Sequence, residues 1–81
     1  MITPAQCRAG RALVDWSQQK LAAAAHIGLV TVRQFEAGRE ARYVTLDAIR
    51  RALEGAGVIF IDENGDGPGV RLRKKPKQPG E

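Results

Sequence analysis

The chain has 81 residues and a formal net charge of +4, and 43% of its residues are apolar while only 5% are aromatic. A single domain of this size buries about 60% of the surface that its unfolded chain exposes, which leaves little room for a deep catalytic cleft. One cysteine and one histidine cannot form a disulfide or a zinc-ligand set, and no apolar stretch approaches the roughly 20 residues of a membrane span. These counts favour a cytoplasmic protein with no metal, no cofactor and no membrane contact.

The N-terminal half of the chain predicts three helices. Residues 3–6 (TPAQ) carry a capping-box pattern with proline at the first helical position, so a helix should begin here and end near Val14 or Asp15. Its core-facing side is expected to carry Ala9, Leu13 and Trp16. Ser17 should cap a second helix, whose inward side is Leu21, Ala22 and Ala25. A third helix should follow Gly28 and end near Gly38, with Val32 and Phe35 inward.

The C-terminal half predicts a fourth helix and a short β-hairpin. Residues 38–44 lack an apolar period and should form an exposed loop, after which Thr45 caps a helix that buries Leu46, Ile49 and Leu53. The runs VIFI at 58–61 and VRLR at 70–73 favour two strands, joined by the turn-forming segment DENGDGPG. That segment opens like a calcium-binding loop, but Arg73 stands where such a loop requires a bidentate glutamate, so we interpret it as a turn.

The stretch from Arg11 to Arg39 resembles the Cro/C1-type, or XRE-type, family of phage-repressor-like helix-turn-helix domains. The matching segments are SQQKLA at 17–22, Ile27 in the turn, Thr31-Val32, and FEAGR at 35–39. Two positions depart from the family pattern: His26 stands where a glycine is usual, and Gly28 replaces the usual serine or threonine cap. The resemblance implies a mainly α, lambda-repressor-like bundle of four to five helices, followed here by a short C-terminal β-strand or hairpin. It also implies an ion pair between Arg11 and Glu36, the alternative being two independent surface charges.

The resemblance places the third helix in the major groove of double-stranded DNA, with one side facing the bases. The corresponding residues here are Leu29, Val30, Thr31, Arg33 and Gln34. Leu29 and Val30 would touch thymine methyl groups, with contact to the protein's own core as the alternative. Arg33 suits guanine, and Gln34 suits adenine. Phosphate contacts are expected from Gln18, more weakly from Gln19, and from Arg39 and Arg42 in the following loop.

The strand segment raises the question of a partner. Apolar residues at 58–61 point alternately to two faces, and a single helical layer would leave one face uncovered. We therefore expect a homodimer through residues 58–73, with packing on the chain's own helices as the alternative. The predicted organisation is a DNA-binding domain at 1–57, a β appendage at 58–73 and a disordered basic tail at 74–81.

Two functional hypotheses follow. The first is a small bacterial transcriptional regulator, repressor-like and nucleoid-associated, that binds DNA sequence-specifically. The second is an antitoxin-like protein-interaction module, in which the strand segment binds another protein and DNA contact is secondary. An enzyme is not expected, because the sequence offers no nucleophile with a base, no paired carboxylates on one helix face and no phosphate-binding loop.

Overall fold

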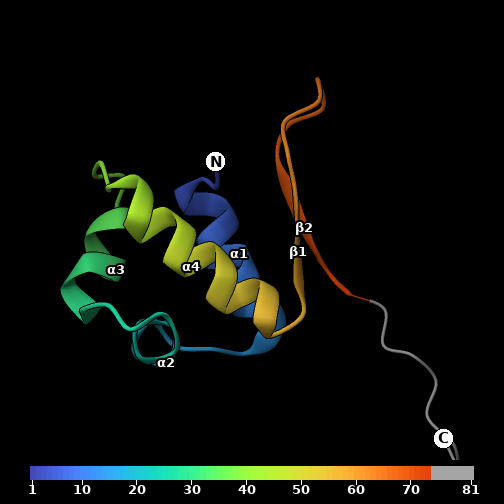
Figure 1. Ribbon diagram of the computed structural model, residues 1–81. Helices are drawn as coiled ribbons and strands as arrows, with labels where there is room; N and C mark the ends of the chain where they lie inside the picture. The colour runs from blue at the N-terminus through green and yellow to red at the C-terminus, as the bar shows by residue number, and fades with distance from the viewer. Residues whose placement is uncertain (74–81) are drawn as a thin grey trace, which may run out of the picture.

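The computed structural model describes residues 1–73 as four helices followed by a two-stranded antiparallel hairpin (Figure 1). The helices are α1 (Pro4–Val14), α2 (Gln18–Ala25), α3 (Leu29–Glu36) and α4 (Tyr43–Gly55), and the strands are β1 (Val58–Ile61) and β2 (Gly69–Leu72). The expected mainly α fold with a C-terminal hairpin is confirmed, with four helices. The predicted tail at 74–81 lies outside the described residues. Across residues 1–73, no helix combines the length and apolarity that a bilayer crossing requires.

The first two helices begin where the sequence predicts, because their caps are local. The hydroxyl of Thr3 accepts a hydrogen bond from the backbone N–H of Gln6, and the Gln6 side chain accepts one from the N–H of Thr3. This reciprocal pair is a capping box, with Pro4 at the first helical position. Ser17 caps α2 by accepting from the N–H of Lys20 at 2.9 Å. Both starts follow from residues within one turn of each other.

The turn between α2 and α3 also follows its local sequence. His26 ends α2 in the left-handed region, at φ 58°, a conformation that histidine tolerates better than most residues. Gly28 is the N-cap of α3 and provides no side-chain hydrogen bond. The short helix α3 therefore begins without a capping side chain, and its position depends on packing and on contacts at its far end.

Two expectations about the helices are wrong. On α1, Ala9 and Leu13 are exposed, and the buried side consists of Gln6, Cys7 and Gly10. Trp16 is only half-buried, although it does pack against the core. The α4 helix begins at Tyr43, with Arg42 as its N-cap, rather than after a cap at Thr45.

The physical reason in both cases is tertiary. Helix α1 approaches α4 and β1 closely at Gly10, where a Cβ would lie 3.3 Å from Leu53 Cδ1 and 3.5 Å from Val58 Cγ1. The side of α1 that carries Gly10 therefore faces inward. Helix α4 forms its first turn without any capping side chain, so its start is fixed by the burial of Ile49 and Leu53 further along the helix.

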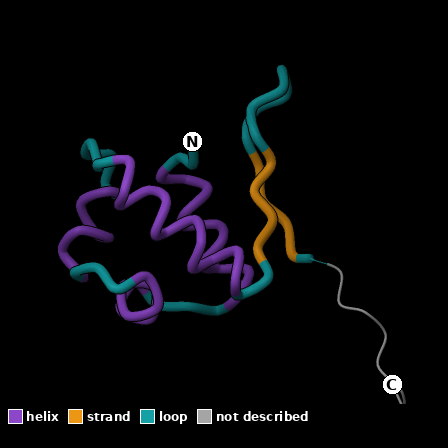
Figure 2. The backbone as a smooth tube through the Cα atoms, viewed as in Figure 1, coloured by secondary structure: helices purple, strands orange, loops and turns teal. Residues whose placement is uncertain are grey.

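The core is shared by all four helices and the hairpin. Its fully buried apolar side chains are Leu21, Val32, Ile49, Leu53 and Val58, with Cys7 beside them. Phe60 and the partly buried Val70 complete the hairpin's contribution, so one face of the strand pair packs on the helices of its own chain. In Figures 1 and 2 the hairpin stands against one side of the helical layer, and α3 lies at the opposite side.

A buried glutamine attaches the hairpin to α1. The Gln6 side-chain amide donates to the carbonyl oxygen of Ile61 at 3.2 Å and to that of Gly69 at 2.9 Å. These two residues face each other across the strand pair. One side chain therefore caps its own helix with its oxygen and holds both strands with its nitrogen, which makes the hairpin an integral part of the domain.

We predict that Gln6→Glu destabilises the protein by about 1–3 kcal/mol at neutral pH. The glutamate keeps an oxygen for the capping box but turns a carboxylate toward the two strand carbonyls. This repulsion should raise the folded-state pKa of the new carboxyl above its unfolded value of about 4.3. The deficit relative to wild type should therefore shrink as the pH falls through that raised pKa and be gone below about 4.3, where the protonated group can donate again. Urea unfolding of the wild type and the variant at several pH values measures this difference in stability.

The control for this prediction is Gln19→Glu, the same chemical change at an exposed position of α2. It should alter the free energy of unfolding by no more than about 0.5 kcal/mol. Equal stability of the two variants at neutral pH would show that the Gln6 amide does not hold the hairpin.

Candidate nucleic-acid interface

The last residue of α3, Glu36, is tied to α1 by a two-pronged ion pair. The Arg11 guanidinium donates from Nε to Oε2 and from Nη2 to Oε1 of Glu36, both at 2.8 Å. The Glu36 side chain is 3% exposed and that of Arg11 is 19% exposed. Paired hydrogen bonds of this kind fix orientation as well as distance. The contact therefore fixes how α3 lies against α1.

Further donors complete the set around Glu36. The Cys7 thiol donates to Oε2 at 3.0 Å, and the Gln18 amide donates to Oε1 at 2.9 Å. Arg8 donates to the backbone carbonyl of Glu36 at the C-terminal end of α3. Arg11 also donates to the carbonyl of Trp16, which joins the end of α1 to the start of α2. A single carboxylate thus connects three helices, and we call these residues the Glu36 cluster: Cys7, Arg8, Arg11, Gln18 and Glu36.

The charges of this cluster balance one another. Burial alone would raise the pKa of Glu36, but hydrogen bonds from Arg11, Cys7 and Gln18 and the attraction of the Arg11 charge outweigh it and lower the pKa. The pKa of the Arg11 guanidinium is raised by its hydrogen bonds to Glu36. The pKa of the Cys7 thiol is raised by burial and by the adjacent carboxylate. Glu36 and Arg11 are therefore charged and Cys7 is a neutral thiol.

The resemblance predicts the pairing of Arg11 with Glu36, whereas no feature of the sequence analysis predicts a role for Cys7 or Arg8. A usable signal was present, because Cys7 and Arg11 are four residues apart and so lie on the same face of α1. Gln18 has a different place from the one expected. One proton of its amide is used inside the cluster, so its side chain is not simply an outward-pointing phosphate ligand.

Helix α3 presents one polar and apolar side to solvent. Val30, Arg33 and Gln34 are exposed, with Val30 at 61%, whereas Val32 and Phe35 are buried in the core. Leu29 is only half-buried and packs against the core cluster. Thr31 is half-buried at the border between the two sides. The exposed side therefore combines an aliphatic, a guanidinium and an amide group on a helix whose opposite side is packed in the core.

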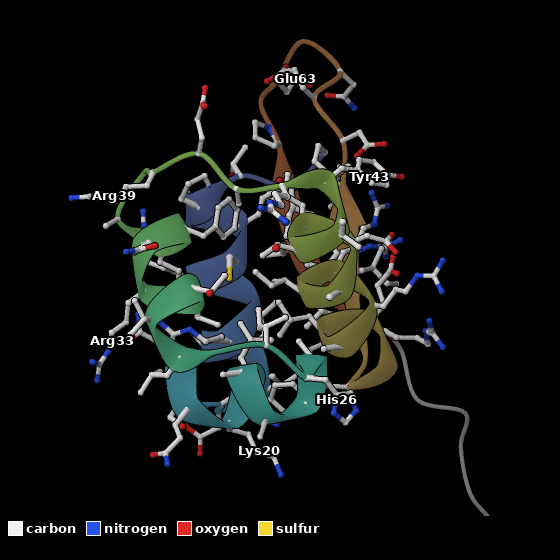
Figure 3. All side chains as sticks on the ribbon, turned by 60° about the vertical axis from the view of Figure 1, so that its left-hand side comes forward. Lys20, His26, Arg33, Arg39, Tyr43 and Glu63 are labelled. Atoms are coloured by element: carbon white, nitrogen blue, oxygen red, sulfur yellow. The ribbon has the colours of Figure 1, made fainter. Side chains whose placement is uncertain are left out.

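The loop after α3 extends this surface. Arg39 and Arg42 are exposed, as is Gln19 on α2. Figure 3 shows Arg33 and Arg39 projecting outward on the same side of the molecule. Between α3 and the start of α4 lies an open hollow of about 320 Å³, lined by Thr31, Gln34, Phe35, Glu40, Ala41, Arg42 and Thr45. The surface around α3 thus includes Arg33, Arg39 and Arg42, with the carboxylate of Glu40 beside the hollow.

We predict that Glu36→Gln lowers the free energy of unfolding by on the order of 3 kcal/mol at neutral pH, because it leaves the Arg11 charge partly buried without its partner. The wild type should also lose stability as the pH falls below about 4.5, where protonation removes the advantage of a depressed pKa. The variant lacks this carboxyl and should show a smaller loss over the same range. Urea unfolding from neutral pH to about pH 3 measures both effects.

Asp47→Asn is the matched control for this change. It also converts a carboxylate to an amide, but its partner Arg51 is 77% exposed, one turn along α4. An exposed pair of this type contributes about 0.3–0.5 kcal/mol. If Glu36→Gln and Asp47→Asn changed stability equally, the cluster would not be what positions α3.

Comparison with known proteins adds no assignment to this geometry. A scan against protein-family models finds no match to the chain, and a search of curated proteins finds no related sequence.

Proposed function

We propose that this chain is a helix-turn-helix DNA-binding protein that reads duplex sequence with α3, as a small transcriptional regulator does. The observation that carries the proposal is the division of α3 into two sides. Val32 and Phe35 fix its inner side in the core, the Glu36 cluster clamps its end, and Val30, Arg33 and Gln34 remain free outside. A rigid helix with a free mixed surface suits the major groove, whose base edges carry both polar groups and methyl groups.

The proposed base contacts follow from side-chain chemistry. The Arg33 guanidinium can donate two hydrogen bonds to the O6 and N7 of guanine, and the Gln34 amide can pair with the N6 and N7 of adenine. The exposed Val30 provides apolar contact for a thymine methyl group. Leu29 shares its surface with the core, and we therefore assign it mainly to holding α3.

The proposed phosphate contacts surround this helix. Arg39 and Arg42 lie in the loop after α3, and each neutralised phosphate would add about 0.9 to the slope of log affinity against log salt. Gln19, Thr31 and the remaining amide proton of Gln18 are polar groups at the edges of the same surface. The formal net charge of +4 favours approach to a polyanion. Contacts of this kind position the protein, and the α3 residues specify the sequence.

One observation favours the second candidate function, a module that binds another protein. Tyr43 and Val44 at the start of α4 are 69% and 72% exposed, and large apolar side chains side by side on a surface are common in protein interfaces. Deleting residues 58–73 would not separate the two candidates, since it removes Val58 and Phe60 from the core. Direct binding to duplex DNA is the discriminating measurement. Absence of any complex with random-sequence duplexes at low salt would favour the protein-binding function.

We predict different defects from two substitutions at the proposed interface. After selection of bound sites from a random duplex pool, Gln34→Ala should prefer different bases from the wild type, because a base contact is removed. Arg42→Ala should weaken all sequences alike and lower the salt slope by about 0.9, because only a phosphate contact is removed. Fluorescence anisotropy on selected and scrambled duplexes measures the affinities.

Arg51→Ala serves as the control for loss of one positive charge. Arg51 is exposed on α4 and lies outside the proposed interface, so its removal should leave the base preference unchanged and the salt slope nearly so. Uniform loss of affinity in both the Gln34 and Arg42 variants would contradict the proposed division between base and phosphate contacts.

A further inference from the structure

The hairpin has one face that its own chain covers and one that it leaves open. Val58 and Phe60 are buried against the helices, and Val70, directly opposite Phe60, packs against the same core. The alternate positions form the other face: Ile59 opposite Arg71, and Ile61 opposite Gly69. Figures 1 and 2 show no part of residues 1–73 on that side of the strands. We call Ile59, Ile61, Gly69 and Arg71 the outer face.

The outer face is apolar along β1. Ile61 is 36% exposed, and its side chain lies across the strand pair, with its Cδ1 3.7 Å from where a Cβ on Gly69 would stand. The absence of a side chain at Gly69 thus lets Ile61 spread over both strands. Ile59, two residues before Ile61 on β1, lies on the same face and is half-buried. A two-stranded sheet with an uncovered aliphatic strip is incomplete as a layer, because sheets are stabilised by covering their apolar faces.

Charges at the two ends of the hairpin have opposite signs. The tip, residues 62–68, carries the exposed acids Asp62, Glu63 and Asp66 and no basic residue. The opposite end, where β1 begins and β2 finishes, carries the exposed bases Arg71 and Arg73 and, within residues 69–73, no acid. A hairpin of this kind is complementary to a copy of itself that runs in the opposite direction.

We propose that the outer face binds a second copy of this chain, with the two hairpins antiparallel across a two-fold axis. In that arrangement Ile59 of one copy packs on Ile61 of the other, and each Arg71 approaches the acidic tip of its partner. The opposite arrangement, with the hairpins parallel, would bring the two acidic tips together and the two basic ends together. Like charges placed face to face oppose association, so the charge pattern selects the antiparallel dimer. Because both copies use the same surface, the contact forms a closed dimer and does not extend into a filament.

The dimer is a weak one. Each strand has four residues, so the contact is small, and protein interfaces that bury less than about 1,200 Å² in total are typical of transient association. We therefore expect a dissociation constant in the micromolar range, with a monomer that is folded in its own right because Val58 and Phe60 are already covered. The inference does not depend on DNA binding, since it concerns the side of the molecule opposite α3.

Sedimentation equilibrium of the full chain tests the apolar part of this contact. Ile61→Lys should raise the dimer dissociation constant by at least about tenfold, because it removes an aliphatic side chain from each copy and faces the partner's Arg71 with a like charge. Leu13→Lys on α1 is the matched control, since Leu13 is 38% exposed and lies on a helix instead of the outer face. It should leave the dissociation constant unchanged. Circular dichroism verifies that both variants are folded.

Charge reversal tests the direction of the two hairpins. Arg71→Glu and Asp66→Arg should each weaken the dimer, and the two changes together should cost less affinity than the sum of the two separate losses, because the new arginine reduces the acidity of the tip that the new glutamate of the other copy approaches. In a parallel dimer the double change would restore nothing, since each position would still face itself. Asp66 is suitable for this purpose because its carboxylate makes no hydrogen bond within residues 1–73, whereas that of Glu63 accepts from the N–H groups of Gly65 and Gly67.

Three results would overturn the proposal: a wild type that stays monomeric at high micromolar concentration, a dimer that Ile61→Lys leaves intact, or a double change whose loss of affinity equals the sum of the two single losses. Each can be told apart from failure of the proposed DNA binding. The oligomeric state is measured without nucleic acid, and Ile61→Lys should leave the affinity of one monomer for duplex DNA unchanged.

Discussion

The arrangement of this domain depends on one carboxylate. Glu36 ends an eight-residue helix that has no capping side chain at its start, and a helix this short is not stable by itself in water. Its carboxylate accepts hydrogen bonds from Arg11 and Cys7 on α1 and from Gln18 on α2. All of these donors converge from behind α3. The inner side of the helix is thus committed to the protein, which is the condition for its outer side to meet a partner in a fixed orientation.

The hairpin is held in a similar way by a single polar side chain near the start of α1. Gln6 uses both ends of its amide, one for the helix cap and the other for the carbonyls of two strands. Helix α1 therefore holds α3 through Arg11 and the hairpin through Gln6, about one and a half turns apart. This explains how the strands of the 58–73 appendage come to share one core with the helices. The same attachment leaves only one sheet face open.

Sequence reasoning succeeded where structure is decided locally and failed where it is decided by distant contacts. The caps at Thr3 and Ser17, the left-handed turn at His26 and the paired strands all involve neighbours in the chain. The helical spacing of Ala9, Leu13 and Trp16 predicts that these residues form the buried side of α1. The real inner side is polar or small, with Gln6, Cys7 and Gly10, and only the residues that meet them explain the choice. The exposed side of α3 could be inferred because Val32 and Phe35 mark its opposite, whereas for Leu29 the sequence left groove contact and core contact both open.

The thiol in the Glu36 cluster has a practical consequence. Alkylating reagents react with thiolates, and Cys7 is fully buried with its pKa raised by burial and by Glu36, so it is shielded from them both sterically and electrostatically. Labelling can proceed only when α1 moves away from the end of α3. The rate of modification of this single native cysteine, followed by mass spectrometry, therefore reports how often the clamp releases, with no probe having to be introduced.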